Sequence, residues 1–139
     1  MRILGLDIGD RRIGVAISDP TEIIASPLTI ITRDNDNTAI ETIIQLVCQY
    51  EVKTIVVGMP YSLDGSIGWQ ATKVKDFVDK LSQNTSAGIE LFDERLSTVA
   101  VERLLSDAGN KKARERSPRD DAAAAFILQG YLDSLKVGD

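Results

Sequence analysis

Acidic residues at three separate points of the chain have the chemistry that a catalytic or metal site needs. Asp7 lies inside an apolar stretch, Asp93-Glu94 ends another, and Asp120-Asp121 precedes a run of alanines. A carboxylate in an apolar strand is costly unless it is paired or binds a cation. The chain has no histidine and one cysteine, which excludes imidazole catalysis and zinc sites built from histidine or thiolate. Carboxylate oxygens suit hard cations such as Mg²⁺ or Mn²⁺.

Each acidic position also has a plainer explanation. Asp7 suits a cap for the turn at Gly9, Asp93-Glu94 a solvated strand end, and Asp120-Asp121 a first helical turn, where acids favour the helix dipole. Neighbouring residues point to opposite faces of a strand and differ by about 100° around a helix, so one member of each pair can share a site with Asp7. Carboxylates that meet from three elements could hold two cations about 3.5–4 Å apart, an arrangement that cleaves phosphodiesters.

The hydrophobic pattern predicts one α/β domain over residues 1–139. Continuous or alternating apolar runs predict strands, and apolar residues at helical spacing predict helices. The expected strands are Arg2–Ile8, Ile13–Ser18, Pro27–Thr32, Thr54–Met59 and Ile89–Phe92, and the expected helices are Asn37–Tyr50 (capped by Asp36 or Asn37), Trp69–Ser82, Ser97–Asp107 and Arg119–Leu135. Three hairpin-linked strands followed by strands that alternate with helices predict a mixed sheet with helices on its faces.

The charge is distributed unevenly along the chain. The net charge of −5 argues against a nucleic-acid partner, but Gly109–Arg119 contains five basic residues and one acidic residue. The candidate phosphate contacts are Arg11, Arg12, Arg95, Lys111, Lys112 and Arg114. Pairing with the neighbouring acids is the alternative for Arg95, and a solvated surface is the alternative for the others. Trp69 either packs, the commoner role at the start of a helix, or stacks on a base.

Nothing in the sequence predicts a membrane partner. The longest uninterrupted apolar run, Ala122–Leu128, has seven residues, whereas a bilayer-spanning helix needs about 20. The first residues show no signal peptide, and a single cysteine cannot form an internal disulfide. These features predict a cytoplasmic protein.

Four motifs, in order along nearly the whole chain, resemble those of one family. They are Asp7–Asp19 (DIGDRRIGVAISD), Val57–Ser66 (VGMPYSLDGS), Asp93–Thr98 (DERLST) and Asp120–Gln129 (DDAAAAFILQ), the last followed by Tyr131-Leu132. The chain resembles the YqgF/RuvX family of Holliday-junction-resolvase-like pre-16S rRNA nucleases. This resemblance implies an RNase H-like fold, with a mixed five-stranded sheet whose first three strands are antiparallel.

The resemblance also implies a site and an activity. The family's acidic triad falls on Asp7, Glu94 and Asp120, and Asp121 either assists or replaces Asp120. The implied activity is endonuclease cleavage with Mg²⁺ or Mn²⁺, in maturation of the 5′ end of the 16S rRNA precursor, where ribosomal particles are further partners. Cleavage of branched DNA, as by a Holliday junction resolvase, is one alternative. A non-catalytic RNA-binding or nucleotide-binding module is another.

Overall fold

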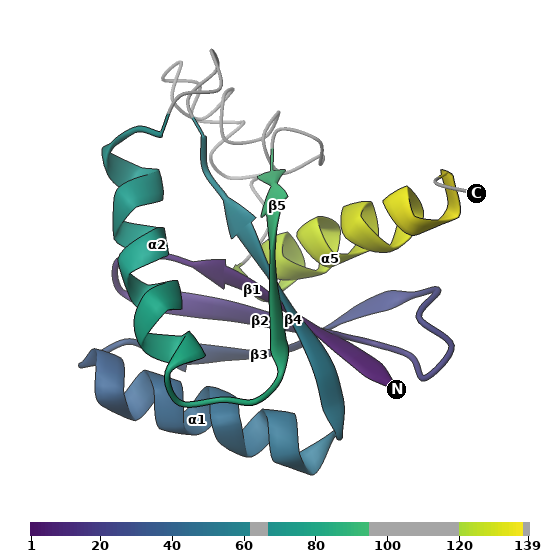
Figure 1. Cartoon of the computed structure of the whole chain (residues 1–139), viewed down its shortest axis with the longest axis horizontal. Helices are drawn as coiled ribbons and strands as arrows, with labels where there is room; N and C mark the ends of the chain where they lie inside the picture. The colour runs from purple at the N-terminus through teal and green to yellow at the C-terminus, as the bar shows by residue number, and fades with distance from the viewer. Residues whose placement is uncertain (62–66, 95–119, 138–139) are drawn as a thin grey trace.

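A mixed sheet with helices on both faces organises the chain (Figure 1). The computed structural model describes residues 1–61, 67–94 and 120–137. Its elements are β1 (Arg2–Ile8), β2 (Arg12–Ser18), β3 (Ala25–Thr32), α1 (Asp36–Gln49), β4 (Val52–Met59), α2 (Trp69–Ser82), β5 (Gly88–Asp93) and α5 (Asp120–Val137). The expected helix over 97–107 lies outside the described residues. Within those residues, no helix is long and apolar enough to cross a membrane.

The strand order in the sheet is β3-β2-β1-β4-β5. β1, β2 and β3 are antiparallel neighbours, whereas β4 is parallel to both β1 and β5. This topology confirms the expected mixed five-stranded sheet. The carboxyl ends of the parallel strands β1, β4 and β5 therefore lie at the same end of the sheet. Open α/β sheets bind their ligands at the carboxyl ends of the strands.

Alternation along the strands divides the core into two layers. Leu4, Leu6 and Ile8 of β1 pack in one cluster with residues of α1 and α2. Ile3 packs in a second cluster with Val56, Phe92 and the apolar side of α5. Because side chains alternate along a strand, odd-numbered residues of β1 and even-numbered residues of β4 and β5 face α5.

The start of α1 differs from the sequence prediction. Asn35, rather than Asp36 or Asn37, is the N-cap, because its side-chain oxygen accepts a hydrogen bond of 2.8 Å from the backbone N–H of Thr38. The Thr38 hydroxyl donates to the same oxygen. Asp36 is thereby left in the first turn, where its carboxylate is available to side chains outside the helix.

Two glycines let α5 lie unusually close to the sheet. A Cβ on Gly5 of β1 would come within 2.8 Å of the Leu128 Cβ and 3.3 Å of the Ala124 carbonyl oxygen. A Cβ on Gly58 of β4 would come within 2.6 Å of the Ile127 Cδ1. The small residues on both surfaces thus set the height of the helix above the strands.

A side-chain clamp fixes α5 along the sheet. The Gln129 Oε1 accepts the backbone N–H of Ala25 at 2.9 Å, and the Gln129 Nε2 donates to the Ile23 carbonyl at 3.0 Å. One amide therefore satisfies backbone groups of the loop and strand that follow β2. This clamp and the glycine contacts together determine where the first turn of α5 lies.

We predict that Gly5→Ala costs about 1–3 kcal/mol of unfolding free energy, since its Cβ would meet fixed atoms of the helix. Gly58→Ala should cost less, because the nearest atom there is the movable end of a side chain. Urea unfolding of both variants measures the two costs. A Gly5→Ala protein as stable as the wild type would contradict this account of the helix position.

Candidate active site

Asp7 is a buried carboxylate at the end of the central strand. Its relative exposure is 6%, and it is paired in register with Gly14 of β2. As an odd-numbered residue of β1 it lies on the α5 side of the sheet, away from the core cluster of α1 and α2. Transfer of an ionised carboxylate from water to such a place is unfavourable unless positive charge or donors compensate it.

Glu94 is the second buried carboxylate, with a relative exposure of 5%. It directly follows β5, whose last residue is Asp93. Among the described residues, only Asp7, Glu94 and Ser18 are buried polar or charged residues. Ser18 has a structural role, since its hydroxyl oxygen accepts the Ile3 N–H at 2.8 Å.

The parallel strands bring these two carboxylates to the same end of the sheet. β4 alone separates β1 from β5, so the two backbones are about 10 Å apart at a strand spacing of about 4.8 Å. The β4 residue level with Phe92 is Gly58, and Ile127 of α5 fills the space above it, since a Cβ on Gly58 would come within 2.6 Å of the Ile127 Cδ1. The two acids thus lie at the carboxyl ends of two strands that one strand separates.

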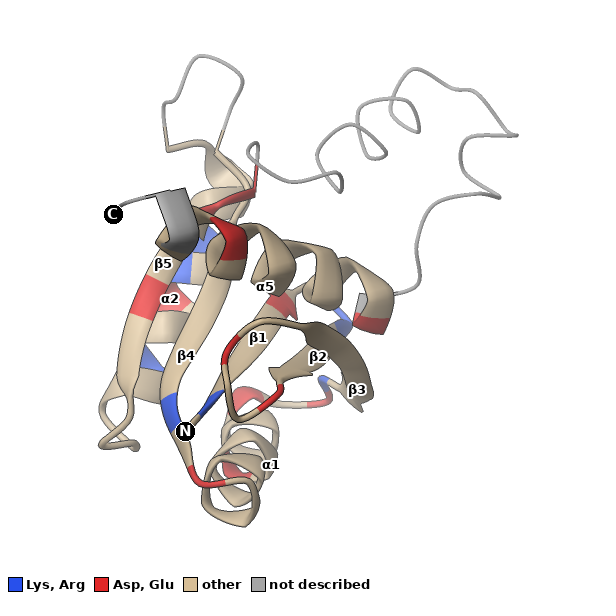
Figure 2. Ribbon diagram, turned by 90° about the vertical axis from the view of Figure 1, so that its right-hand side faces the viewer, with Lys and Arg blue, Asp and Glu red and all other residues tan. Residues whose placement is uncertain are grey.

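The first turn of α5 supplies the remaining acidic residues. Asp120 begins the helix, and its side chain lies outside the described part of the structure. The Asp121 Oδ1 accepts the backbone N–H of the next residue, Ala122, at 2.9 Å. Figure 2 shows acidic residues in red at the start of α5. The first turn of α5 therefore contains both acidic residues that the sequence analysis singled out here.

The donor chemistry of the site fits a hard divalent cation. Both described candidates are carboxylates, and Mg²⁺ and Mn²⁺ prefer oxygen ligands. No group of three acidic, histidine or cysteine side chains suited to a metal occurs within the described residues, and the third expected donor, the Asp120 side chain, falls outside them. Two buried carboxylates plus one donor from α5 would complete the set.

The turn after Asp7 is held in place by Arg33, which follows β3. The Arg33 Nη1 donates to the Gly9 carbonyl at 2.8 Å, and its backbone N–H donates to the Arg11 carbonyl at 2.8 Å. The guanidinium is itself fixed by the Asp36 Oδ1 at 2.9 Å and lies 4.9 Å from the centre of the buried Phe77 ring. Arg33 therefore links the end of β1 to both α1 and α2.

Two carboxylates outside the site have lowered pKa values. The hydrogen bond from Arg33 is the main cause of the lowered pKa of Asp36, and Lys80 contributes a second bond at 3.1 Å. The pKa of Asp19 lies far below its usual range, because its carboxylate accepts backbone N–H groups of Ile24, Ile23 and Thr21 and the Thr21 hydroxyl. Asp19 thus shapes the loop between β2 and β3.

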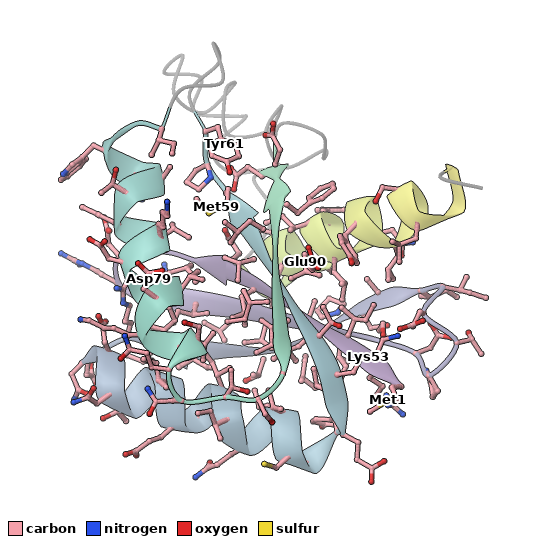
Figure 3. The ribbon with its side chains drawn as sticks, in the orientation of Figure 1. Met1, Lys53, Met59, Tyr61, Asp79 and Glu90 are labelled. Carbon is pink, nitrogen blue, oxygen red and sulfur yellow. The ribbon has the colours of Figure 1, made fainter. Side chains whose placement is uncertain are left out.

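The expected nucleic-acid contacts are only partly described. Arg11 and Arg12 are exposed at the turn between β1 and β2, at the edge where Asp7 lies. Arg95, Lys111, Lys112 and Arg114 lie outside the described residues, as does 62–66 of the central loop. Tyr61, at the start of that loop, lies between α2 and the end of β5 (Figure 3). The prediction that Trp69 most often packs is wrong, since the side chain is 75% exposed.

Sequence reasoning missed the roles of Arg33 and Gln129. Arg33 contacts Gly9, 24 residues earlier, and Gln129 contacts Ala25, 104 residues earlier. No local spacing links such partners. The only signal for Gln129 in the sequence was its polar side chain, which follows a run of small and apolar residues in the helix.

Comparison with solved structures confirms the fold class. RuvC of T. thermophilus in complex with a Holliday junction substrate superposes with a TM-score of 0.60 at 10% identity, covering 98% of this chain and 96% of that one. The fowlpox virus resolvase bound to Holliday junction DNA has a TM-score of 0.53 at 18% identity, covering 97% and 99%. The fold is therefore the RNase H-like fold of these resolvases.

Comparison of sequences then gives the family. The model of the family described as "RuvX: Holliday junction resolvase" matches residues 1–134. Proteins named "Putative pre-16S rRNA nuclease" are 47% identical in Roseiflexus sp. (97% of this chain, 96% of that protein) and 45% identical in Clostridium botulinum (97% and 98%). The chain belongs to the RuvX (YqgF) family. It is thus a nuclease that hydrolyses phosphodiester bonds, and its substrate class is nucleic acid.

We predict that Asp36→Asn weakens the acid dependence of stability. The folded-state pKa of Asp36 is lowered, so its contribution of about 1 kcal/mol is present above the unfolded pKa and disappears as pH falls through the folded value. Urea unfolding at pH 7 and near pH 3 measures this. The variant should be less stable at pH 7 and should lose less stability on acidification. If the free energy of unfolding fell as much between pH 7 and pH 3 in the variant as in the wild type, that result would contradict the Arg33–Asp36 interaction.

We also predict that Mn²⁺ stabilises the folded protein through the buried acids. At 100 times its dissociation constant the ion adds about 2.7 kcal/mol, which raises the melting temperature by about 8 °C. Asp7→Asn and Glu94→Gln should lose this shift, and EDTA should remove it from the wild type. Glu90→Gln is the matched control, because Glu90 lies on β5 and is exposed. A full shift in Asp7→Asn would place the ion elsewhere.

Proposed function

We propose that the chain is a metal-dependent endonuclease that matures the 5′ end of the 16S rRNA precursor in the cytoplasm. The observation that carries the proposal is the pair of buried carboxylates, Asp7 and Glu94, at the carboxyl ends of β1 and β5. The names of relatives that are 45–47% identical over almost the whole chain support the substrate. Ribosomal particles are then the natural setting of the reaction.

Asp7, Glu94 and Asp120 would hold Mg²⁺ or Mn²⁺ in this proposal. A divalent cation at such a site activates water and neutralises the charge that develops on the phosphate and the leaving oxygen. Asp7 contributes a carboxylate fixed by the central strand, and Glu94 contributes one fixed by the end of β5. Because the acids are buried, their charge acts in a medium less polar than water, where attraction to a cation is stronger.

The chain's basic side chains would position the nucleic-acid backbone. Arg11 and Arg12 are exposed at the edge that carries Asp7, so phosphates on either side of the scissile bond can reach them. Arg95, Lys111, Lys112 and Arg114 are proposed as further phosphate contacts from their place in the sequence. These contacts would give affinity that falls with salt concentration and does not depend on base sequence.

Cleavage of four-way DNA junctions is the second candidate. The description of the matching family model favours it, and both structural neighbours above were solved with junction DNA. The acidic site would serve either substrate, since RNA and DNA share the phosphodiester group. The choice between them is a property of the surface around the acids.

A direct cleavage comparison tests the proposal. Purified protein with Mg²⁺ or Mn²⁺ is incubated with an RNA that spans the 5′ end of the 16S sequence and, separately, with a four-way DNA junction. We expect cleavage of the RNA at a defined position, reduced at least about 100-fold in Asp7→Asn and Glu94→Gln and close to normal in Glu90→Gln. Circular dichroism confirms that each variant is folded. Cleavage by Asp7→Asn at the wild-type rate would reject the proposed site.

A further inference from the structure

Trp69, the first residue of α2, is the most exposed large apolar side chain among the described residues, at 75%. Ile67, two residues before it, is 56% exposed. The helix geometry explains why the ring does not pack. The buried side of α2 runs through Ala71, Val74, Phe77, Val78 and Leu81. Trp69 is two residues before Ala71, about 200° around the helix, and therefore points away from the sheet.

A lysine covers one side of the exposed ring. The Lys73 Nζ is 3.5 Å from the centre of the Trp69 ring, a cation–π contact between residues one helical turn apart. The same Nζ is 3.4 Å from the Asp10 Oδ1. The lysine thus holds the ring in one orientation and connects it to the turn that follows β1.

The contact between Lys73 and Asp10 places the Trp69 ring near the end of the sheet where the acidic residues lie. Asp10 is three residues after Asp7, in the turn with Arg11. α2 follows β4, whose carboxyl end is at the same edge as the ends of β1 and β5. α2 lies on the face of the sheet opposite to α5. A nucleic-acid strand that passes over this end of the sheet could therefore contact both the acidic residues and the Trp69 ring.

We infer that Trp69 is a stacking platform for an unpaired base of the nucleic-acid strand bound at the acidic site. A flat aromatic ring with one side exposed matches the π-face that every base presents. The positive charge of Lys73 and the absence of an acidic residue in the first turn of α2 suit a ligand with phosphates. The inference rests on the proposed nuclease function, and it adds that the bound strand is single-stranded beside the cleavage point.

The chain offers an unusually direct probe, because Trp69 is its only tryptophan. Fluorescence excited at a wavelength selective for tryptophan reports on this ring alone. The titration uses the wild-type protein in EDTA, so that binding is measured without cleavage. The probes are a short single-stranded RNA, the same strand with abasic sites in place of its bases, and the fully paired duplex.

We expect the single strand to quench Trp69, and the abasic strand and the duplex to leave its emission almost unchanged. Trp69→Ala, followed by fluorescence anisotropy of a labelled strand, should weaken binding about 5- to 150-fold, the range that corresponds to one stacked base. Trp69→Phe should restore much of the affinity. Ile24→Ala is the control, because Ile24 is 60% exposed but lies in the loop between β2 and β3.

Equal quenching by the abasic strand or by the duplex would overturn the inference, as would a Trp69→Ala protein that binds the single strand normally. Absence of quenching by any probe would also overturn it and would leave a protein surface as the partner of the ring. The proposed function fails differently. If the strand quenches Trp69 but is never cleaved with Mg²⁺ or Mn²⁺, the stacking inference stands and the nuclease site is wrong.

Discussion

The burial of two negative charges at one end of the sheet is the constraint on which the rest of the structure depends. Asp7 and Glu94 are 6% and 5% exposed, and an ionised carboxylate in such a place is costly unless a cation or hydrogen-bond donors compensate it. Such a site gains stability when a divalent ion binds. The fold therefore keeps two carboxyl groups out of water at the end of the sheet where we propose that phosphodiester cleavage takes place.

The surrounding elements keep these charges in place in different ways. Parallel pairing of β1, β4 and β5 aligns the strand ends. Arg33 holds the turn that follows Asp7, and its own position is fixed by Asp36 and Phe77. The close contact of α5 with Gly5 and the clamp made by Gln129 fix the helix that begins with Asp120. Substitutions far from the acids should thus change the geometry of the site.

The sequence predicted most of the architecture because the signals involved are local. Alternating or continuous apolar runs and helical spacing gave every strand and helix of the described residues, with ends within two residues of those observed. The errors have local physical causes. Asn35 became the cap of α1 because only its side chain reaches the Thr38 N–H, and Trp69 is exposed because its position lies opposite the buried side of α2.

The candidate site was less predictable, since it depends on residues that meet only after folding. Asp7 could be singled out as a carboxylate inside an apolar strand, but the choice of Glu94 over Asp93 required a family resemblance. In the structure Glu94 is 5% exposed, whereas Asp93, the last residue of β5, is partly exposed. The part played by Arg33 could not be seen in the sequence, because its contact with Gly9 joins separate strands.

A crystal of the protein soaked in Mn²⁺ tests the central claim most directly, because anomalous scattering locates the ion without assumptions about the reaction. The account predicts anomalous density at the end of β1, within coordination distance of carboxylate oxygens of Asp7, Glu94 and Asp120. Mn²⁺ found only at other carboxylates would contradict it. So would an Arg95 guanidinium that fills the space between these acids and excludes the ion.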